Sequence, residues 1–184
     1  MDKLSSSASD VLLLRRIAGG DELAFSELYQ RYHVPIFNYV LRLIRDPKEA
    51  EDLLQEIFLA VWRGAYRYRE QAQVKTWLYS IAHYQAVSWL RKRRLVTLFE
   101  DGVDLYSEGP EHITADIMQR DDVRKALNCL STKHRAVLEL AFVHGMAYKE
   151  IAQVVGCPVG TVKSRMSYAL RALNGKLKET DFTT

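Results

Sequence analysis

The 184-residue sequence lacks most of the features that mark secreted, metal-binding and membrane proteins. Its two cysteines, Cys129 and Cys157, have no second cysteine or histidine at metal-ligand spacing. We therefore expect reduced thiols in a cytoplasmic protein, with no metal site and no cofactor. No apolar run approaches the roughly 20 residues that cross a bilayer, and no signal-peptide pattern opens the chain, so membrane insertion is not expected.

Catalytic patterns are also missing. The five histidines are scattered along the chain, and none is paired with a nucleophile or carboxylate in a catalytic arrangement. We therefore predict no catalytic residues and a protein that is not an enzyme. The composition, 48% apolar and 27% charged, is ordinary for a soluble helical protein of one or two domains.

Charge is unevenly distributed, although the net charge is only +3. Residues 1–96 carry 15 Lys and Arg against 11 Asp and Glu, and residues 120–184 carry 11 against 6. Residues 97–119 contain six acidic residues and no Lys or Arg. This pattern predicts two basic domains joined by a flexible acidic linker, which could stretch to roughly 75–80 Å, about two turns of B-DNA. A plain solvated linker explains the same composition at least as well.

The segment from Tyr148 to Leu173 has the pattern of a helix-turn-helix, with its turn at Gly156-Cys157-Pro158. Gly156 can adopt the left-handed conformation, and Pro158 fits just before or inside a helix start. The apolar residues expected to face inward are Ile151, Ala152 and Val155 in the first helix and Val162, Met166, Ala169, Leu170 and Leu173 in the second.

The other faces of the second helix suit DNA, because polar side chains can approach base edges in the major groove while cations contact phosphates. An ordinary helical hairpin with a solvated basic surface is the alternative for this segment. The residues expected to contact DNA are Thr161, Lys163, Ser164, Arg165, Ser167, Tyr168 and Arg171.

The N-terminal domain is expected to be wholly helical. Asp21 is a favourable N-cap for a first helix, which Pro35 should kink or interrupt. Asp46 and Glu49 have the spacing of a capping box for a second helix that runs to about Arg63. This second helix has an apolar stripe, but an acidic and apolar mixture lies partly outside the stripe and indicates a protein partner.

The third long helix, residues 74–94, ends in four consecutive cations, and aromatic residues surround it that a core does not obviously require. Aromatic faces among cations suit single-stranded DNA, since stacking contributes about 1–3 kcal/mol per base. We expect Trp77 in the core. The surrounding aromatics are Tyr66, Tyr68, Tyr79 and Tyr84.

Four blocks in this order carry a family resemblance: GDELAF at residues 20–25, AEDLLQEIF at 50–58, TWLYSIA at 76–82, and the helix-turn-helix. Together they resemble the extracytoplasmic-function (ECF) sigma factors of the sigma-70 family, which are dissociable specificity subunits of bacterial RNA polymerase. The resemblance covers nearly the whole chain.

The resemblance implies an all-α fold with two small helical domains. Residues 21–96 would form sigma region 2, a helical bundle, and residues 120–178 would form region 4, which contains the helix-turn-helix. Residues 97–119 would be the acidic linker, which in this family threads the polymerase near its RNA path. Residues 1–20 would be an N-terminal segment with a helix starting near Asp10, and residues 179–184 a tail.

The implied function is to bind core RNA polymerase and direct promoter-specific transcription initiation. Region 2 would dock on the clamp helices of the β′ subunit, recognise the -10 element and assist melting, while region 4 would recognise the -35 element, with the β flap as a further polymerase contact. An anti-sigma factor is a plausible inhibitor, and bound factor would be associated with the nucleoid. The residues implied in core-polymerase binding are Asp52, Gln55, Glu56, Phe58, Leu59 and Trp62.

The chain departs from the usual family pattern after Ala82, where His83-Tyr84-Gln85 stands. The identity of the residues that form the -10 base pocket therefore stays open, and we predict that Tyr84 stacks on an unpaired base. The residues implied in -10 binding are Tyr68, Arg69, Lys75, Tyr84, Gln85, Arg91, Arg93 and Arg94.

Two other classes of protein fit some of the same residues. Residues 130–173 also resemble the output domains of response regulators, which would suit a free-standing helix-turn-helix transcriptional regulator. That class needs a sensory or receiver domain, and the N-terminal half shows no alternation of strands and helices. An RNA-binding adaptor would use the basic and aromatic surface without a sequence-specific helix in the major groove.

Overall fold

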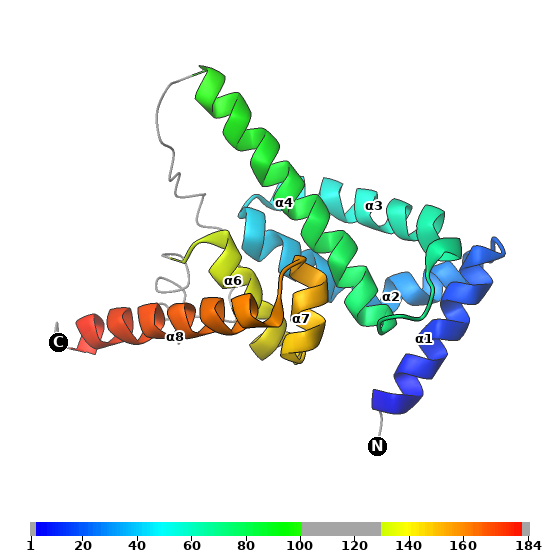
Figure 1. The fold of residues 1–184 in the computed structure, drawn as a ribbon. Helices are drawn as coiled ribbons and strands as arrows, with labels where there is room; N and C mark the ends of the chain where they lie inside the picture. Colours follow the sequence, from blue (N-terminus) through cyan, green and yellow to red (C-terminus); the bar gives the residue numbers. More distant parts are fainter. Residues whose placement is uncertain (1–2, 101–129, 182–184) are drawn as a thin grey trace. The chain divides into compact units, whose positions relative to one another are not determined.

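The computed structural model describes residues 3–100 and 130–181, and within these ranges the chain is helical and has no strand (Figure 1). The chain divides into two compact units, residues 1–109 (unit 1) and 110–184 (unit 2). The predicted all-α fold with two small domains is therefore confirmed.

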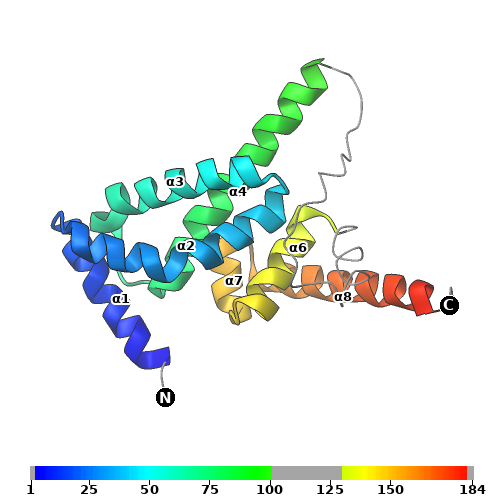
Figure 2. The same ribbon diagram turned by 180° about the vertical axis from the view of Figure 1, so that it is seen from behind.

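Unit 1 is a helical bundle in which α2 packs on α3 and α4, while α1 packs on α2 and η1 (Figures 1 and 2). Large side chains with no exposed surface at its centre include Leu28, Ile36, Ile57 and Leu78. Its elements are α1 (Lys3–Ala18), α2 (Glu22–Ile44), α3 (Pro47–Gly64), the short 3-10 helix η1 (Ala65–Arg67) and α4 (Val74–Glu100).

The helix starts in unit 1 follow from local capping. Asp21 accepts a hydrogen bond from the Ala24 backbone N–H at 3.0 Å, and Asp46 accepts one from the Glu49 N–H at 3.2 Å. The expected second half of the capping box is absent, because the Glu49 carboxylate instead accepts a hydrogen bond from Trp89 Nε1 at 2.7 Å. Pro35 lies inside α2 and does not interrupt it.

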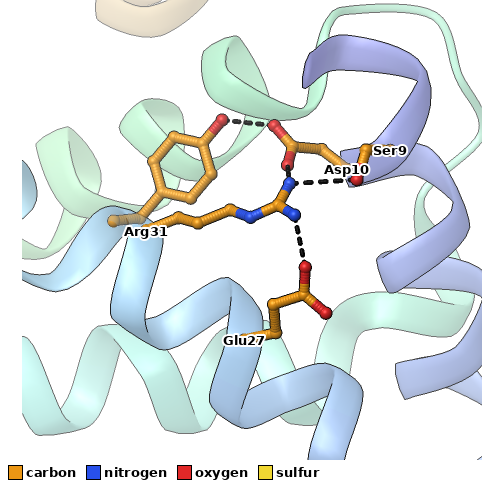
Figure 3. Close-up of polar contacts among 5 residues, drawn as sticks. Ser9, Asp10, Glu27 and Arg31 are labelled. Atoms are coloured by element: carbon orange, nitrogen blue, oxygen red, sulfur yellow. Dashed lines mark hydrogen bonds and ion pairs between the residues drawn. The ribbon is translucent and has the colours of Figure 1, made fainter. Parts of the chain in front are cut away.

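The N-terminal helix α1 begins at Lys3, seven residues earlier than expected, and belongs to the bundle. Its apolar face buries Leu13, Leu14 and Ile17. Asp10 is 2% exposed and accepts hydrogen bonds from Arg31 Nη1 at 2.7 Å and from the Tyr32 hydroxyl at 2.5 Å (Figure 3). The same Arg31 also donates to Ser9 and Glu27, so a polar network joins α1 to α2.

Unit 2 consists of α6 (Thr132–Leu138), a π-helical turn η3 (Glu139–Val143), α7 (Tyr148–Val155) and α8 (Val159–Asp181). Ile151 and Val154 are the buried residues of α7, whereas Ala152 and Val155 are half-buried. In α8 the buried stripe is shorter than expected, because Leu170 is 39% exposed. The stripe consists of Val162, Met166 and Ala169.

The linker prediction lies largely outside the described residues. Helix α4 continues to Glu100 and so includes the first four residues of the expected linker, 97–119. The boundary between the two units, at residues 109 and 110, falls inside that expected segment. Among the helices described, none is both long enough and apolar enough to cross a membrane.

Candidate partner-binding and nucleic-acid interfaces

Helix α3 presents one face to solvent, which we call the α3 surface and define as Asp52, Gln55, Glu56 and Leu59. These four side chains are exposed, and Leu59 is 46% exposed. Their spacing of three and four residues places them on one side of the helix. Neither Asp52 nor Glu56 forms an ion pair with another residue that the structure describes. The α3 surface therefore combines unneutralised acidic groups with an exposed aliphatic side chain.

Two aromatic residues expected on this surface belong wholly or partly to the interior. Phe58 is 3% exposed and lies with its ring centroid 6.2 Å from that of Phe25 and 4.7 Å from that of Tyr29. It therefore cannot contact a partner directly, because two aromatic rings of α2 cover it. Trp62 is half-buried, with its ring 5.2 Å from Phe25. These aromatic side chains form a layer between α3 and α2, on the inner side of the helix that carries the α3 surface.

An open groove of about 520 Å³ continues the α3 surface toward α4. Gln85, expected at the -10 element, lies in this groove with Glu56 and Leu59 of the α3 surface. The structure thus brings one expected DNA-binding residue beside expected polymerase-binding residues. The groove is lined by Glu56, Leu59, Ala60, Arg63, Gly64, Arg67 and Gln85.

The loop between η1 and α4, residues 68–73, is held by its own side chains. The Tyr68 hydroxyl donates a hydrogen bond to the Ala72 carbonyl at 2.6 Å, and the Tyr68 ring lies 5.5 Å from that of Trp77. Burial, with the nearby carboxylates of Glu70 and Asp10, raises the pKa of the Tyr68 hydroxyl. Arg69 is exposed. Tyr68 is therefore bonded within the loop, and Arg69 is the exposed cation of the loop.

Helix α4 distributes the expected -10 residues over several faces. Tyr84 is 69% exposed and lies two turns before the exposed Arg91, so the two share one side of the helix. Arg94 is also exposed, and Lys75 is half-buried in the first turn. Arg93 is exposed but lies 3.4 Å from the Asp46 carboxylate and 5.0 Å over the Trp89 ring, toward α3.

One aromatic residue near α4 was wrongly expected outside the core. Tyr79 is 1% exposed, because its ring lies 5.4 Å from Tyr39 of α2. The Tyr39 hydroxyl is 2.8 Å from Nδ1 of His83. At residues 83–85, where the sequence departs from the family pattern, His83 pairs with Tyr39, Tyr84 is exposed and Gln85 lines the groove.

Helix α8 presents the expected base-contacting residues as an exposed band. The turn before it places Gly156 at φ 63°, and both the Gly156 and Cys157 N–H groups donate to the Ala152 carbonyl. The predicted left-handed turn is confirmed, and α8 starts directly after Pro158. Exposed residues of the band are Lys163, Ser164, Ser167, Tyr168 and Arg171, whereas Thr161 and Arg165 are half-buried.

Sequence reasoning missed His134 of α6, which stacks on Tyr168 with ring centroids 4.3 Å apart. Its Nδ1 lies 2.9 Å from the Ser131 hydroxyl. Burial and the nearby cations Arg165 and Lys133 lower the pKa of His134. The two rings are 34 positions apart in the sequence, so no local pattern could have found the pair. Also missed was an apolar site at η3, where Phe142 is 70% exposed.

No group of three or more His, Cys, Asp or Glu side chains in the described part of the chain could hold a metal ion.

Comparisons with known proteins match both units. Residues 28–96 match the model for Sigma-70 region 2, and residues 120–173 match that for Sigma-70, region 4. The ECF RNA polymerase sigma factor SigK of Mycobacterium tuberculosis is 33% identical over 171 residues, covering 90% of this chain and 91% of that protein. A SigK of Mycobacterium sp. (strain KMS) is 31% identical over 172 residues, covering 90% and 89%.

Solved structures give the same match. The sigma factor RpoE from Bartonella quintana, in complex with the anti-sigma factor NepR, has a TM-score of 0.70 and 29% sequence identity, covering 84% of this chain and 96% of that chain. CnrH in complex with the cytosolic domain of CnrY also has a TM-score of 0.70, covering 93% and 98%, and at 23% identity it supports the fold alone.

Proposed function

Because the chain belongs to the ECF sigma factors of the sigma-70 family, which direct RNA polymerase to promoters, we propose that its two units divide this work between named surfaces. Unit 1 docks on core polymerase through the α3 surface and contacts the -10 element through the loop at residues 68–73 and the exposed side of α4. Unit 2 contacts the -35 element through α8. A free-standing regulator would leave the region 2 match unexplained.

The observation that carries the polymerase assignment is the exposure of the α3 surface above a buried aromatic layer. An aliphatic side chain beside unneutralised carboxylates suits a protein partner with an apolar contact and cationic groups, such as the proposed β′ clamp helices. The groove that holds Gln85 extends this surface toward α4. Docking there leaves Tyr84 and Arg91, which lie on the exposed side of α4, free to contact DNA.

The DNA assignment is supported by the exposed band on α8 and by cations without carboxylate partners. Lys163 and Arg165 form no ion pair with any residue in the described part of the chain. Such cations can replace counterions at phosphates, while Ser164, Ser167 and Tyr168 can approach base edges. The exposed apolar site at Phe142 of η3 is available for the β flap.

An anti-sigma factor is the second partner we propose. The RpoE of Bartonella quintana was solved in complex with an anti-sigma factor, and its chain resembles this one over 84% of the length. An inhibitor that covers the α3 surface would block polymerase docking without any change in unit 2.

The test is transcription initiation by the purified chain with core RNA polymerase on a library of genomic fragments, with start sites mapped. We expect core-dependent initiation from promoters that share two elements, and weaker core binding by Asp52→Ala/Gln55→Ala. Glu22→Ala, which removes an exposed carboxylate from α2, is the matched control. Selection of duplex sites without any core dependence would favour the free-standing regulator instead.

A further inference from the structure

Helix α1 lies before residue 28, where the region 2 match begins, yet it contacts the loop proposed to bind the -10 element. Arg15 of α1 binds one carboxylate oxygen of Glu70 through two nitrogens, with Nη2 at 2.6 Å and Nε at 3.1 Å from Oε1. The α1 helix also packs on η1, which leads into the same loop. The N-terminal helix therefore contacts this loop although it lies before the matched residues 28–96.

Glu70 has an unusual backbone. Its φ is +56°, and within the described ranges the other non-glycine residue with positive φ is Arg45, which ends α2. Left-handed conformations are unfavourable for residues with a Cβ, and they persist where the surroundings impose them. The side-chain exposures of Arg15 and Glu70 are 64% and 47%, so their ion pair adds little to global stability. The ion pair does, however, link α1 to the centre of the loop.

The two residues before Glu70 are the proposed DNA contacts. Tyr68, fixed through its hydroxyl to Ala72, precedes Arg69, and Arg69 precedes Glu70 directly. A change in the backbone conformation of Glu70 would change the direction of the adjacent Arg69 side chain. The loop ends are already held, since the Tyr68 N–H donates to the Ala65 carbonyl and the Trp77 N–H to Gln73. Arg15 supplies a restraint at the middle.

Helix α1 is itself attached to α2 by buried contacts. Asp10 binds Arg31 and Tyr32 of α2 while almost fully buried (Figure 3). The buried side chains of Leu13 and Ile17 lie on either side of Arg15 in the sequence. Arg15 therefore projects from a fixed helix.

We propose that Arg15 is a positioning residue for -10 recognition: by binding Glu70 it keeps the loop in the conformation that presents Tyr68 and Arg69 to the non-duplex -10 strand. The ligand that the positioned loop binds is single-stranded promoter DNA. The inference rests on the proposed role of the loop, and it adds α1 to the recognition apparatus.

The experiment uses holoenzyme assembled from the full chain and core polymerase. Binding of a fluorescent single strand carrying the mapped -10 element is compared with binding of a scrambled strand. Arg15→Glu and Glu70→Arg should each reduce the preference for the -10 strand about three- to fivefold. The double variant Arg15→Glu/Glu70→Arg should restore it, because the ion pair is rebuilt with reversed charges.

Two comparisons separate positioning from general electrostatics. Glu70→Arg adds a cation beside the DNA site, so simple charge attraction predicts tighter binding, whereas loss of positioning predicts weaker discrimination. Arg16→Ala is the control on α1, because Arg16 pairs with Asp21 at 2.7 Å and not with the loop. Holoenzyme with this variant should prefer the -10 strand as strongly as the wild type does. Affinity for core polymerase should not change in any of these variants.

The outcomes are distinct for the inference and for the function beneath it. If the wild-type holoenzyme shows no preference for the -10 strand, the proposed role of the loop fails, and the inference with it. If the wild type discriminates and the single reversals do so equally well, the positioning role alone is wrong. Weakened single variants that the double variant does not restore would show that the side chains act separately, which also overturns the proposal. Glu70→Ala, which keeps the Cβ at the positive φ but removes the carboxylate that Arg15 binds, should keep core affinity and lose discrimination.

Discussion

Among the polar side chains of unit 1, Asp10 is the one whose removal we expect to lower the free energy of unfolding most. Asp10→Ala would leave the half-buried Tyr32 hydroxyl without its acceptor and would remove one of the acceptors of Arg31, which keeps Ser9 and Glu27. We expect the free energy of unfolding to fall by about 1–3 kcal/mol, below the cost of breaking a fully buried pair because the Arg31 side chain is 33% exposed. Urea unfolding followed by tryptophan fluorescence measures this, since all three tryptophans lie in unit 1.

The control for Asp10 is its neighbour in the same network. Ser9 accepts a hydrogen bond from the same Arg31 at 3.1 Å, but at an exposed position. Ser9→Ala should change stability by less than about 0.5 kcal/mol. Equal losses in the two variants would contradict the importance assigned to burial of the carboxylate.

His134 gives unit 2 a pH dependence of defined sign. Its pKa in the folded state lies below the ordinary value of about 6.5, so the unfolded chain binds more protons between these two values. The stability contribution is therefore present above pH 6.5 and is lost as the pH falls through the folded pKa. His134→Phe keeps an aromatic ring beside Tyr168 and should remove this dependence.

Two measurements check His134. The ring resonances of His134 in NMR spectra should titrate below pH 6.5. In thermal unfolding followed by circular dichroism, the Tm of His134→Phe should rise relative to that of the wild type as the pH falls from 7.5 to 5.5. A constant difference across this range would contradict the assignment.

At the residue level, the sequence predicted local contacts better than distant ones. Asp21 and Asp46 were assigned as caps because the cap and its bonded N–H lie within three residues. Tyr79 was wrongly expected outside the core, and Phe58 was expected on the partner surface. Both are buried by aromatic residues of α2, at positions about 30 to 40 residues away, which no local periodicity reveals.

The turn of the helix-turn-helix depends on one glycine, and a second glycine supplies its control. Gly156→Ala forces a Cβ into a left-handed conformation at φ 63° and should destabilise unit 2 by about 1 kcal/mol. Gly175→Ala lies inside α8, where an added Cβ meets no atom within 4 Å, and should stabilise it by about 0.5–1 kcal/mol. Amide hydrogen exchange of α7 and α8 would show the opposite signs, and equal effects would contradict the role of the turn.

At the level of elements, the sequence located helices well but not all of their ends. The turn at Gly156 and the start of α3 were predicted, because glycine and proline restrict the backbone locally. Helix α1 was expected to start at Asp10, yet it extends to Lys3 with Asp10 inside. Local sequence does not reveal that Asp10 lies inside the helix, because its partners Arg31 and Tyr32 lie on α2.

At the level of the whole molecule, two separate units imply that affinity for a promoter comes from linked binding events. If α8 binds the -35 element, it holds unit 1 near the -10 element and raises its effective concentration there. Lys163→Ala/Arg171→Ala should therefore weaken initiation from a two-element promoter about tenfold or more and reduce the salt-dependence slope by about two, if both side chains contact phosphates.

The same double variant should leave the functions of unit 1 intact, because no residue of unit 1 changes. Core affinity and binding of a single-stranded -10 element should equal those of the wild type, and the initiation defect should shrink as the holoenzyme concentration rises. Lys149→Ala, which removes an exposed cation from α7, is the control and should have little effect. An equal defect on a template that is already melted and lacks a -35 element would show that unit 2 acts after DNA binding, and would contradict a division of labour based on affinity.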